Sequence, residues 1–446
     1  MKLRSFFLVL IATLLTTNLH AYRIAAWIPP WDPASLTSIQ LHAGSLDESN
    51  PVWYSMTSNG SIVVNWNGEN PTWIAAMTGT KIVPTIQNVV NGSYDATVVE
   101  TLLVSATSRE AHAQAIFNLV TSKAWDGIDI DYERVPTTSR TNFTAFINTL
   151  AAKLHSAGKT LSVTVYSKTS DAQNWNGPGA QDWPALGAAA DSIKLMAYDY
   201  HWSTSTAGAI TPLAWLDSVV TYAESAIPAA KIIVGLPWYG YDWQGSNGTG
   251  VVYEEAVALA ATNNASIQRD ENGEATFTYG GTHTVFFQDA TAYSRKTDLI
   301  RQKHPNVGGF TSWRTGGEDP GVWSVISTLR GTTTPTPPPA SGVSPDFSLS
   351  GPSSLNVRIG RSSSATYSIT RIGGFSDAVT VVAEKLTPFD ATLSLSATSL
   401  SGTTTSTSLK VATTRATAAG TYSLRVRFTS GSLVKEQIIS VTVSKH

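Results

Sequence analysis

The sequence predicts an α/β chain of two domains: a (β/α)8 barrel of the TIM type with a small α+β insertion before its last strand, and then an all-β sandwich. Two observations predict this order. In residues 22–330, strand-like apolar runs alternate with helical patterns, as parallel β/α units do. After residue 345 the helical patterns stop, none of the 14 Trp residues remains, and short alternating runs follow one another.

The first 21 residues have the pattern of a secretory signal peptide. Lys2 and Arg4 precede an apolar run, and Leu19-His20-Ala21 resembles a cleavage site, so we expect cleavage after Ala21. A membrane anchor is the alternative, but the run is shorter than the ~20 residues that span a bilayer. No later segment is long and apolar enough to span a membrane. We therefore expect a secreted chain, extracellular or periplasmic.

Composition excludes several classes of function. The chain has no Cys, which excludes disulfides, zinc-thiolate sites and iron-sulfur clusters. The formal charge is -2, and residues 345–446 hold ten basic and five acidic groups, so the acidic excess lies in the first domain. No basic patch of the nucleic-acid-binding kind is present. The eight His form no metal motif, and neither a P-loop nor G-x-S-x-G occurs. We expect no metal, no cofactor and no nucleic-acid partner.

The barrel prediction rests on the number of β/α units in about 300 residues. A doubly wound open sheet is the alternative, but no G-x-G-x-x-G phosphate loop follows an early strand. Residues 244–300 interrupt the alternation with a helix, a hairpin and a helix, and are predicted to form the insertion. The strand-like runs are RIAAWI, KIVPTI, GIDIDY, LSVTVYS, SIKLMAY, KIIVGLPWYG and GGFTSW.

Two segments follow the barrel. Residues 331–345, GTTTPTPPPASGVSP, form a Pro/Thr-rich linker that is expected to be extended. Residues 346–446 contain about seven or eight short strand-like runs separated by Ser, Thr and Gly clusters, which predict a β-sandwich. Their pattern resembles the immunoglobulin-like repeats of bacterial secreted proteins.

An acidic stretch, DGIDIDYE at residues 126–133, alternates carboxylates with large apolar side chains. Successive side chains of a strand point to opposite faces, so Asp129, Asp131 and Glu133 share one face. In a barrel this face is the interior, and Glu133 lies at the C-terminal strand end, where active sites of this fold occur. Repulsion between the carboxylates raises the pKa of at least one of them. Glu133 is then the candidate proton donor, with Asp131 as its hydrogen-bond partner.

Two other interpretations of this stretch are weaker. A calcium loop of the D-x-D type needs Gly and polar residues for its turn, and the spacers here are apolar and branched. A charge cluster without chemistry does not explain three carboxylates on one inward face at a strand end.

The motif D-x-x-D-x-D-x-E resembles the signature of glycoside hydrolase family 18, the chitinase-like enzymes. Asp126, Asp129, Asp131 and Glu133 match all four of its positions. LMAYDYHW resembles the family's M-x-Y-D strand and matches it at Met196, Tyr198 and Asp199. GLPWYGYDW and GGFTSWR resemble two later strands, and Trp313 in the last would form the floor under the reacting sugar. The resemblance covers residues 22–330.

Within the family, the chain is most similar to the subgroup of spore-cortex-lytic N-acetylglucosaminidases. The S-x-G-G motif of large chitinases is absent, and KIVPTIQNV stands in its place. No LysM wall-binding repeat is present either. The expected partner is therefore an N-acetylglucosamine glycan, either chitin and its oligomers or the glycan strand of peptidoglycan. A chitinase-like lectin is the rival interpretation, but such proteins usually replace the terminal acid, and Glu133 is present.

The resemblance also implies a mechanism. Glu133 would protonate the glycosidic oxygen, and the substrate's own 2-acetamido group would attack the anomeric carbon with retention. Asp131 would orient the acetamido N–H, and Tyr198 and Asp199 would hold the same group; Asp129 is carried over as part of the catalytic motif. An inverting route with Asp199 as base stays open, since its carboxyl groups lie ~6.5–9.5 Å apart.

Aromatic side chains near strand ends suit the apolar faces of sugar rings. Trp313 is the main candidate, and Trp202, Trp243 and Trp27 are further candidates, together with Met196. Most other Trp residues are expected to belong to the core. We expect the protein to be a monomer.

Overall fold

The computed structural model describes residues 22–171, 174–331, 346–352, 354–372, 377–401, 405–430 and 433–445. The predicted signal peptide at 1–21 lies outside the described residues, as does the predicted linker after Gly331. The chain divides into two compact units between Thr334 and Pro335.

The first unit is built on an 11-stranded sheet whose strands, apart from β4, run parallel to their neighbours. Its order is β4-β3-β6-β9-β10-β11-β12-β18-β1-β2-β5. The strands are β1 (Arg23–Ile28), β2 (Glu48–Pro51), β3 (Tyr54–Met56), β4 (Ile62–Val64), β5 (Lys81–Ile82), β6 (Thr85–Gln87), β9 (Gly127–Asp131), β10 (Thr160–Tyr166), β11 (Ser192–Met196), β12 (Ile232–Pro237) and β18 (Gly309–Trp313).

This sheet curls back on itself. Residues 48–56 supply β2 and β3, and residues 81–87 supply β5 and β6. The same two stretches pair at both ends of the order, as β2 with β5 and as β3 with β6. The curl brings the carboxyl ends of the parallel strands to one end of the unit.

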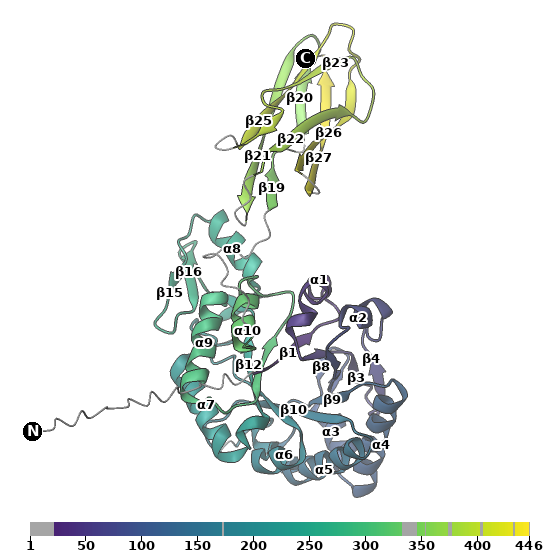
Figure 1. The fold of residues 1–446 in the computed structure, drawn as a ribbon, viewed down its shortest axis with the longest axis vertical. Coiled ribbons are helices and arrows are strands. Elements are labelled where there is room, and N and C mark those ends of the chain that lie inside the picture. The colour runs from purple at the N-terminus through teal and green to yellow at the C-terminus, as the bar shows by residue number, and fades with distance from the viewer. Residues whose placement is uncertain are drawn as a thin grey trace, which may run out of the picture. The chain divides into compact units, whose positions relative to one another are not determined.

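Helices lie around the outer side of the curled sheet (Figure 1). Several begin at a side chain that accepts a hydrogen bond from a free backbone N–H, as Asp95, Ser105 and Asp289 do for α3, α4 and α9. The helices are α1 (Pro33–His42), α2 (Pro71–Ala76), α3 (Ala96–Leu103), α4 (Ala106–Ser122), α5 (Arg140–Ser156), α6 (Trp183–Ala189), α7 (Leu213–Ala226), α9 (Ala290–Lys303) and α10 (Val322–Leu329).

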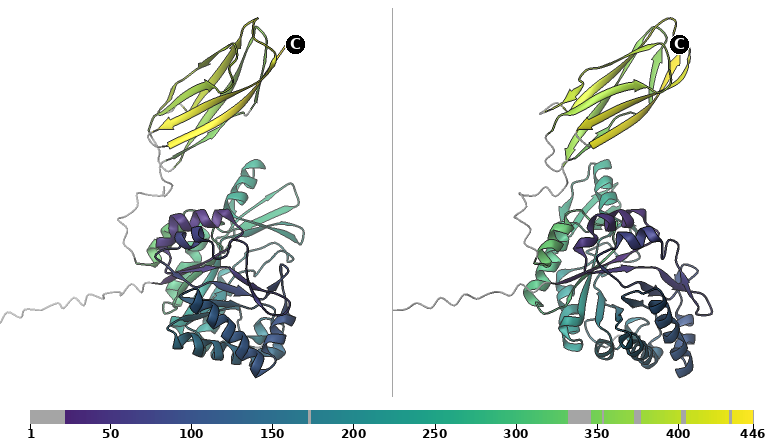
Figure 2. Two further views of the ribbon diagram at one scale, coloured as in Figure 1. Left: turned by 90° about the vertical axis from the view of Figure 1, so that its right-hand side faces the viewer. Right: turned by 45° about the vertical axis from the view of Figure 1, so that its right-hand side comes forward.

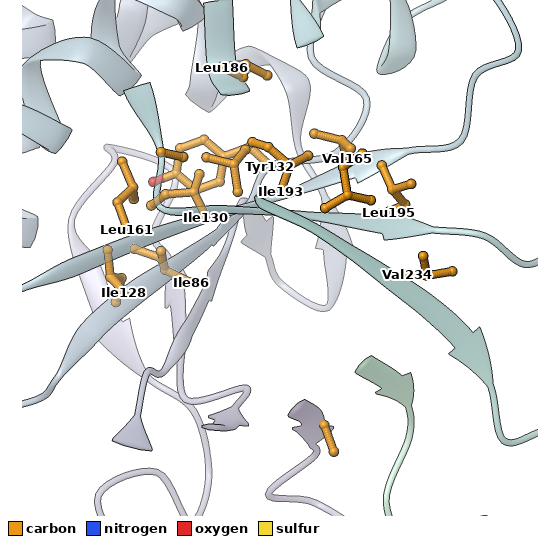
Figure 3. Packing of buried hydrophobic residues seen from close by; sticks show 14 of the residues in the cluster. Ile86, Ile128, Ile130, Tyr132, Leu161, Val165, Leu186, Ile193, Leu195 and Val234 are labelled. Carbon is orange, nitrogen blue, oxygen red and sulfur yellow. The ribbon is translucent and has the colours of Figure 1, made fainter. Parts of the chain in front are cut away.

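The core lies between the strands and these helices. Figure 3 shows Ile128, Ile130 and Tyr132 of the acidic stretch on the same side of the sheet as Leu161 of β10, and all four are at most 1% exposed. These side chains share one side of the sheet because Ile128 of β9 pairs with Leu161 of β10 in the parallel ladder. The apolar half of the acidic stretch thus faces the helices, and the carboxylates face the other way.

The insertion before β18 is larger at its start than predicted and shorter at its end. It forms a five-stranded sheet in the order β14-β13-β17-β16-β15, with α8 (Tyr253–Thr262) beside it. Its first strand begins at Gly240, not at 244, and α9 packs against α7 and α10 as part of the helical layer. The helical pattern of α9 is the same whether the helix belongs to the insertion or to the outer layer of helices. The sequence pattern therefore could not place this boundary. The strands are β13 (Gly240–Gln244), β14 (Asn247–Val251), β15 (Gln268–Arg269), β16 (Ala275–Tyr279) and β17 (His283–Phe287).

The second unit contains only strands among its described residues, in two layers (Figure 2). One sheet has the order β19-β21-β25-β23, and the other has the order β20-β27-β26-β22-β24. Alternation along the strands buries one face of each, as in β25, where Leu409 and Val411 are fully buried. The strands are β19 (Asp346–Ser350), β20 (Ser354–Arg358), β21 (Ser362–Ile372), β22 (Val379–Lys385), β23 (Ala391–Leu395), β24 (Ser399–Leu400), β25 (Ser406–Thr413), β26 (Gly420–Ser430) and β27 (Leu433–Ser444).

Candidate active site

A cavity of about 1020 Å³ opens at the carboxyl ends of the parallel strands of the first unit. Asp131 and Glu133 line it, together with Tyr198 and Asp199 from the segment after β11. The aromatic and thioether residues that line it include Trp27, Tyr94, Tyr166, Trp175, Met196, Trp202, Trp215, Tyr239, Tyr241 and Trp313. Gly250, Val251 and Glu255 of the insertion complete part of the wall. An aromatic-lined cavity that also holds carboxylates suits a polar ligand that has apolar faces.

Asp129 lies below this cavity and is not among its lining residues. Its carboxylate is fully buried and accepts hydrogen bonds from Trp27 Nε1 at 3.1 Å and Ser162 Oγ at 2.6 Å. Thr85 and Thr164 donate to it as well, and Lys194 Nζ lies 3.4 Å away. The structure thus gives Asp129 a supporting position, because a carboxylate enclosed by five partners does not reach a ligand.

Asp131 occupies the next inward position of β9 and is 6% exposed. Its Oδ2 accepts a hydrogen bond of 2.8 Å from Gln87 Nε2, whereas its Oδ1 is buried and has no hydrogen-bond partner. Burial, and then the charge of Glu133, raise the pKa of Asp131 well above its ordinary value. The raised pKa predicted for the acidic stretch therefore lies on Asp131. An unpartnered buried oxygen beside a cavity is a place for a ligand group to bind.

Glu133 follows the end of β9 by two residues and is held at both its backbone and its side chain. Asn88 forms two 2.8 Å hydrogen bonds to its backbone, from Nδ2 to the Glu133 carbonyl and from the Glu133 N–H to Oδ1. The Tyr166 hydroxyl donates to Oε2 at 2.5 Å, and Tyr94 hydrogen-bonds to the same side chain. The hydrogen bond predicted between Asp131 and Glu133 is not found between these described residues. Gln87 binds Oδ2 of Asp131 instead, and Tyr166 binds Oε2 of Glu133.

The segment after β11 carries a second pair of predicted residues. Asp199 adopts the left-handed backbone conformation at φ 59°, which few residues other than Gly, Asn and Asp adopt readily. Its Oδ1 accepts hydrogen bonds from Tyr239 at 2.5 Å and Tyr241 at 3.1 Å. Burial raises the pKa of Asp199, the two tyrosines lower it, and the Glu133 charge raises it. Tyr198 is half-buried and lines the cavity, where burial and the Asp131 charge keep its hydroxyl protonated by raising its pKa well above the ordinary value.

The predicted aromatic residues divide into two groups. Trp313, Trp27 and Trp202 line the cavity, and Trp202 is 48% exposed. Trp243 does not: its side chain is fully buried against Phe286, and its Nε1 donates to the Trp202 carbonyl at 3.0 Å. The prediction of Trp243 as a ligand-binding residue is therefore wrong. Its position in β13 of the insertion sheet, not at the end of a parallel strand, turns the indole into the core.

Several residues that hold the site together were missed from the sequence. Gln87, Tyr94, Tyr166, Tyr239 and Tyr241 line the cavity, and Asn88 holds the backbone of Glu133. Gln87 follows its strand run, KIVPTIQ, and Tyr166 ends LSVTVY, so a polar residue at the end of a parallel strand is the signal that could have found both. Tyr94 gave no such signal, because it lies in the short hairpin of β7 (Val89–Val90) and β8 (Ser93–Tyr94).

No group of three or more His, Asp or Glu side chains among the described residues is arranged to hold a metal ion. Over the same residues, no helix has both the length and the apolar character that crossing a membrane requires.

The fold and the cavity together define a glycosidase: a curled parallel sheet with helices outside it, and paired carboxylates in an aromatic-lined hollow at the strand ends. The chain belongs to the glycosyl hydrolases family 18, whose sequence model matches residues 75–318.

Curated relatives and solved structures agree with this assignment. Bacillus subtilis YdhD is 30% identical over 60% of this chain and 66% of its own length. The cortical fragment-lytic enzyme of Bacillus anthracis is 29% identical over 57% of this chain and 61% of its own length. The aligned part thus covers under two thirds of either relative.

Two solved structures are also similar. The Chromobacterium violaceum chitinase is 26% identical at a TM-score of 0.65, covering 70% of this chain and all of that one. The Bacillus cereus spore cortex-lytic enzyme SleL is 25% identical at a TM-score of 0.64, and the match covers 69% of this chain and 74% of that one.

Proposed function

We propose that this chain hydrolyses β-1,4 bonds of glycans that contain N-acetylglucosamine, by a retaining mechanism in which the substrate's acetamido group is the nucleophile. The observation that carries the proposal is the unpartnered, buried Oδ1 of Asp131 at the base of the cavity, beside Glu133. A carboxyl oxygen there accepts the acetamido N–H and turns the acetamido carbonyl toward the anomeric carbon.

Glu133 is the proposed general acid and base. Its backbone is fixed by Asn88 and its Oε2 by Tyr166, so the side chain is held at the cavity wall. In the first step, Glu133 protonates the leaving glycosidic oxygen while the acetamido carbonyl oxygen attacks the anomeric carbon and forms an oxazolinium ring. In the second step, Glu133 takes a proton from water, which opens the ring and restores the configuration.

The remaining cavity residues are assigned to binding. Tyr198 keeps its hydroxyl proton because its pKa is raised, so it is a donor to the acetamido carbonyl. Asp199 is fixed by Tyr239 and Tyr241 and is assigned to the same acetamido group. Trp313 is assigned as the platform under the sugar ring, with Met196, Trp27 and Trp202 as further contacts, because carbon-rich sugar faces pack on aromatic rings.

The domain organisation remains a proposal as well. The pairing of residues 48–56 with 81–87 at both ends of the strand order supports a closed (β/α)8 barrel. The two packed sheets of the second unit support an immunoglobulin-like sandwich. Export after cleavage at Ala21, an extended linker and a monomeric state belong to the same proposal.

Two glycans fit this proposed function. Chitin and its oligomers are favoured by the similarity to the Chromobacterium violaceum chitinase, and peptidoglycan by the similarity to the Bacillus anthracis relative, which is named a cortical fragment-lytic enzyme. The test is incubation of the purified chain with soluble chitooligosaccharides and with peptidoglycan, followed by mass analysis of the products. We expect products that end in N-acetylglucosamine from at least one glycan. Intact material from both would refute the proposed function.

A further inference from the structure

Arg134 directly follows Glu133, lines the cavity and is exposed. Its backbone N–H hydrogen-bonds to the hydroxyl of Tyr166, the same hydroxyl that donates to Glu133 Oε2. The Arg134 backbone is therefore tied to the side chain that positions the acid. The Arg134 side chain therefore extends from a backbone position that is held next to Glu133.

The charges around the cavity single out this arginine. Four carboxylates line the cavity, those of Asp131, Glu133, Asp199 and Glu255, and the lining cations are two arginines. The charge of Arg314 is already paired, because Arg314 forms an ion pair with Asp32. Throughout the described ranges, no carboxylate forms an ion pair with Arg134. Arg134 is thus a lining cation that is free to meet a charge on a ligand.

The backbone conformation of Arg134 indicates that its side chain is needed at this position. Its φ is 56°, in the left-handed region that Gly adopts at no cost and that Arg adopts with strain. The aliphatic part of an exposed Arg gains little packing to offset this strain. Strained residues gather at ligand-binding sites, where a side chain is needed in that place.

We propose that Arg134 binds a carboxylate of the glycan, and that the substrate is a glycan in which N-acetylglucosamine alternates with a sugar acid whose carboxyl group is free, as in peptidoglycan strands that lack stem peptides. This inference rests on the proposed function and names its substrate class. A guanidinium binds a carboxylate through two parallel hydrogen bonds, which a neutral glycan cannot offer. Because Arg134 adjoins Glu133, the carboxylate belongs to a sugar next to the cleaved bond. The arginine also offsets the repulsion that the ionised carboxylates of the cavity exert on an anionic chain.

The test compares two substrates that differ only in the charge of their carboxyl groups. They are a soluble tetrasaccharide of alternating N-acetylglucosamine and N-acetylmuramic acid, and the same tetrasaccharide with its carboxylates methylated. For the native chain, kcat/KM is expected to be about tenfold higher for the free acid, and Arg134→Gln is expected to remove this preference. Arg134→Lys is expected to keep part of it. The preference is also expected to shrink as salt is raised.

Two further variants separate binding from folding. Arg134→Gly relieves the left-handed backbone, so it should lose the preference without a lower Tm. Lys81→Gln removes the same charge from an exposed residue that does not line the cavity, and should keep the preference. An acid-to-ester ratio that is equal in the native chain and in Arg134→Gln would overturn the inference.

A binding measurement keeps this test independent of turnover. Calorimetric Kd values for both tetrasaccharides, measured on Glu133→Gln and on Glu133→Gln with Arg134→Gln, should show the same loss of preference. If chitotetraose is cleaved but the ratio does not depend on Arg134, the inference fails and the proposed function stands. If no glycan is cleaved, the proposed function fails, and the Kd ratio alone decides whether Arg134 selects a carboxylate.

Discussion

The Tyr166 hydroxyl donates a 2.5 Å hydrogen bond to Oε2 of Glu133, from the end of β10 to the second residue after β9. The two neighbouring parallel strands thereby fix one oxygen of the carboxyl group. Tyr94 also hydrogen-bonds to this side chain. The acid is therefore oriented before a substrate enters.

Tyr166→Phe should lower kcat more than it raises KM. The substitution removes the hydroxyl and keeps the ring, so Glu133 loses its orientation while the cavity keeps its shape. Misplacement of a reacting group lowers rates by roughly tenfold to a hundredfold. Steady-state kinetics on a soluble oligosaccharide measure this. Tyr279→Phe is the matched control, because it removes a hydroxyl that donates 2.6 Å to Asp242 in the insertion, away from the cavity.

Glu133→Gln should abolish hydrolysis and leave oligosaccharide binding largely intact. The amide has the size of the acid but cannot transfer the proton, and general acid catalysis contributes ~10²–10⁴-fold in each step it serves. Turnover and calorimetric binding of the same oligosaccharide measure the two effects. Glu271→Gln, an exposed glutamate outside the cavity, controls for loss of charge. Near-native turnover in Glu133→Gln would remove Glu133 from its assigned role.

Asp131→Asn should become more stable relative to the native chain as pH rises. The pKa of Asp131 is raised in the folded chain, so the folded state holds a proton that the unfolded state has released above about pH 4. The native chain therefore loses stability as pH rises from there through the folded pKa, and the Asn variant does not. Tm values of both chains between pH 4 and pH 8 measure this difference. A Tm difference that stays constant with pH would contradict the raised pKa.

The second unit should be dispensable for cleavage of soluble oligosaccharides. The cavity is lined entirely by residues between Trp27 and Arg314, within the first unit. A shortened chain that ends at Gly331 keeps the ion pair of Arg330 with Asp47 and should retain native kcat/KM on a short substrate. Folding is checked by the cooperativity of its thermal transition. A folded but inactive shortened chain would show that the β-sandwich takes part in catalysis.

Much of this site could be predicted from the sequence, because strand alternation is a local property. The parity of Asp129, Asp131 and Glu133 is predicted from the alternating side chains of one strand. The β9 register includes Asp129 and Asp131, and Glu133 lies two residues past the strand and lines the same cavity as Asp131. Strand alternation does not predict which side chain hydrogen-bonds to each carboxylate. Gln87 and Tyr166 come from the neighbouring strands β6 and β10, and their contacts depend on a register that only the folded sheet defines.

The prediction for Trp243 is wrong because it relies on distance along the sequence. It follows the strand run KIIVGLPWYG closely in sequence, but the parallel strand β12 ends at Pro237 and Trp243 already belongs to the antiparallel sheet of the insertion. Nearness to a strand end in the sequence did not mean nearness to the cavity. Trp313, by contrast, is the last residue of β18 and does line it.

The configuration of the first product tests the central claim most directly. Proton NMR of the reaction, recorded before mutarotation, identifies the anomer released from a soluble N-acetylglucosamine oligosaccharide. Attack by the acetamido group predicts a β-anomer, the retained configuration, and no cleavage beside a glucosamine that lacks its acetyl group. Asp199 acting as a base on water predicts the α-anomer instead, with tolerance of the missing acetyl group. An α-anomer as the first product would contradict the mechanism proposed for Glu133 and Asp131.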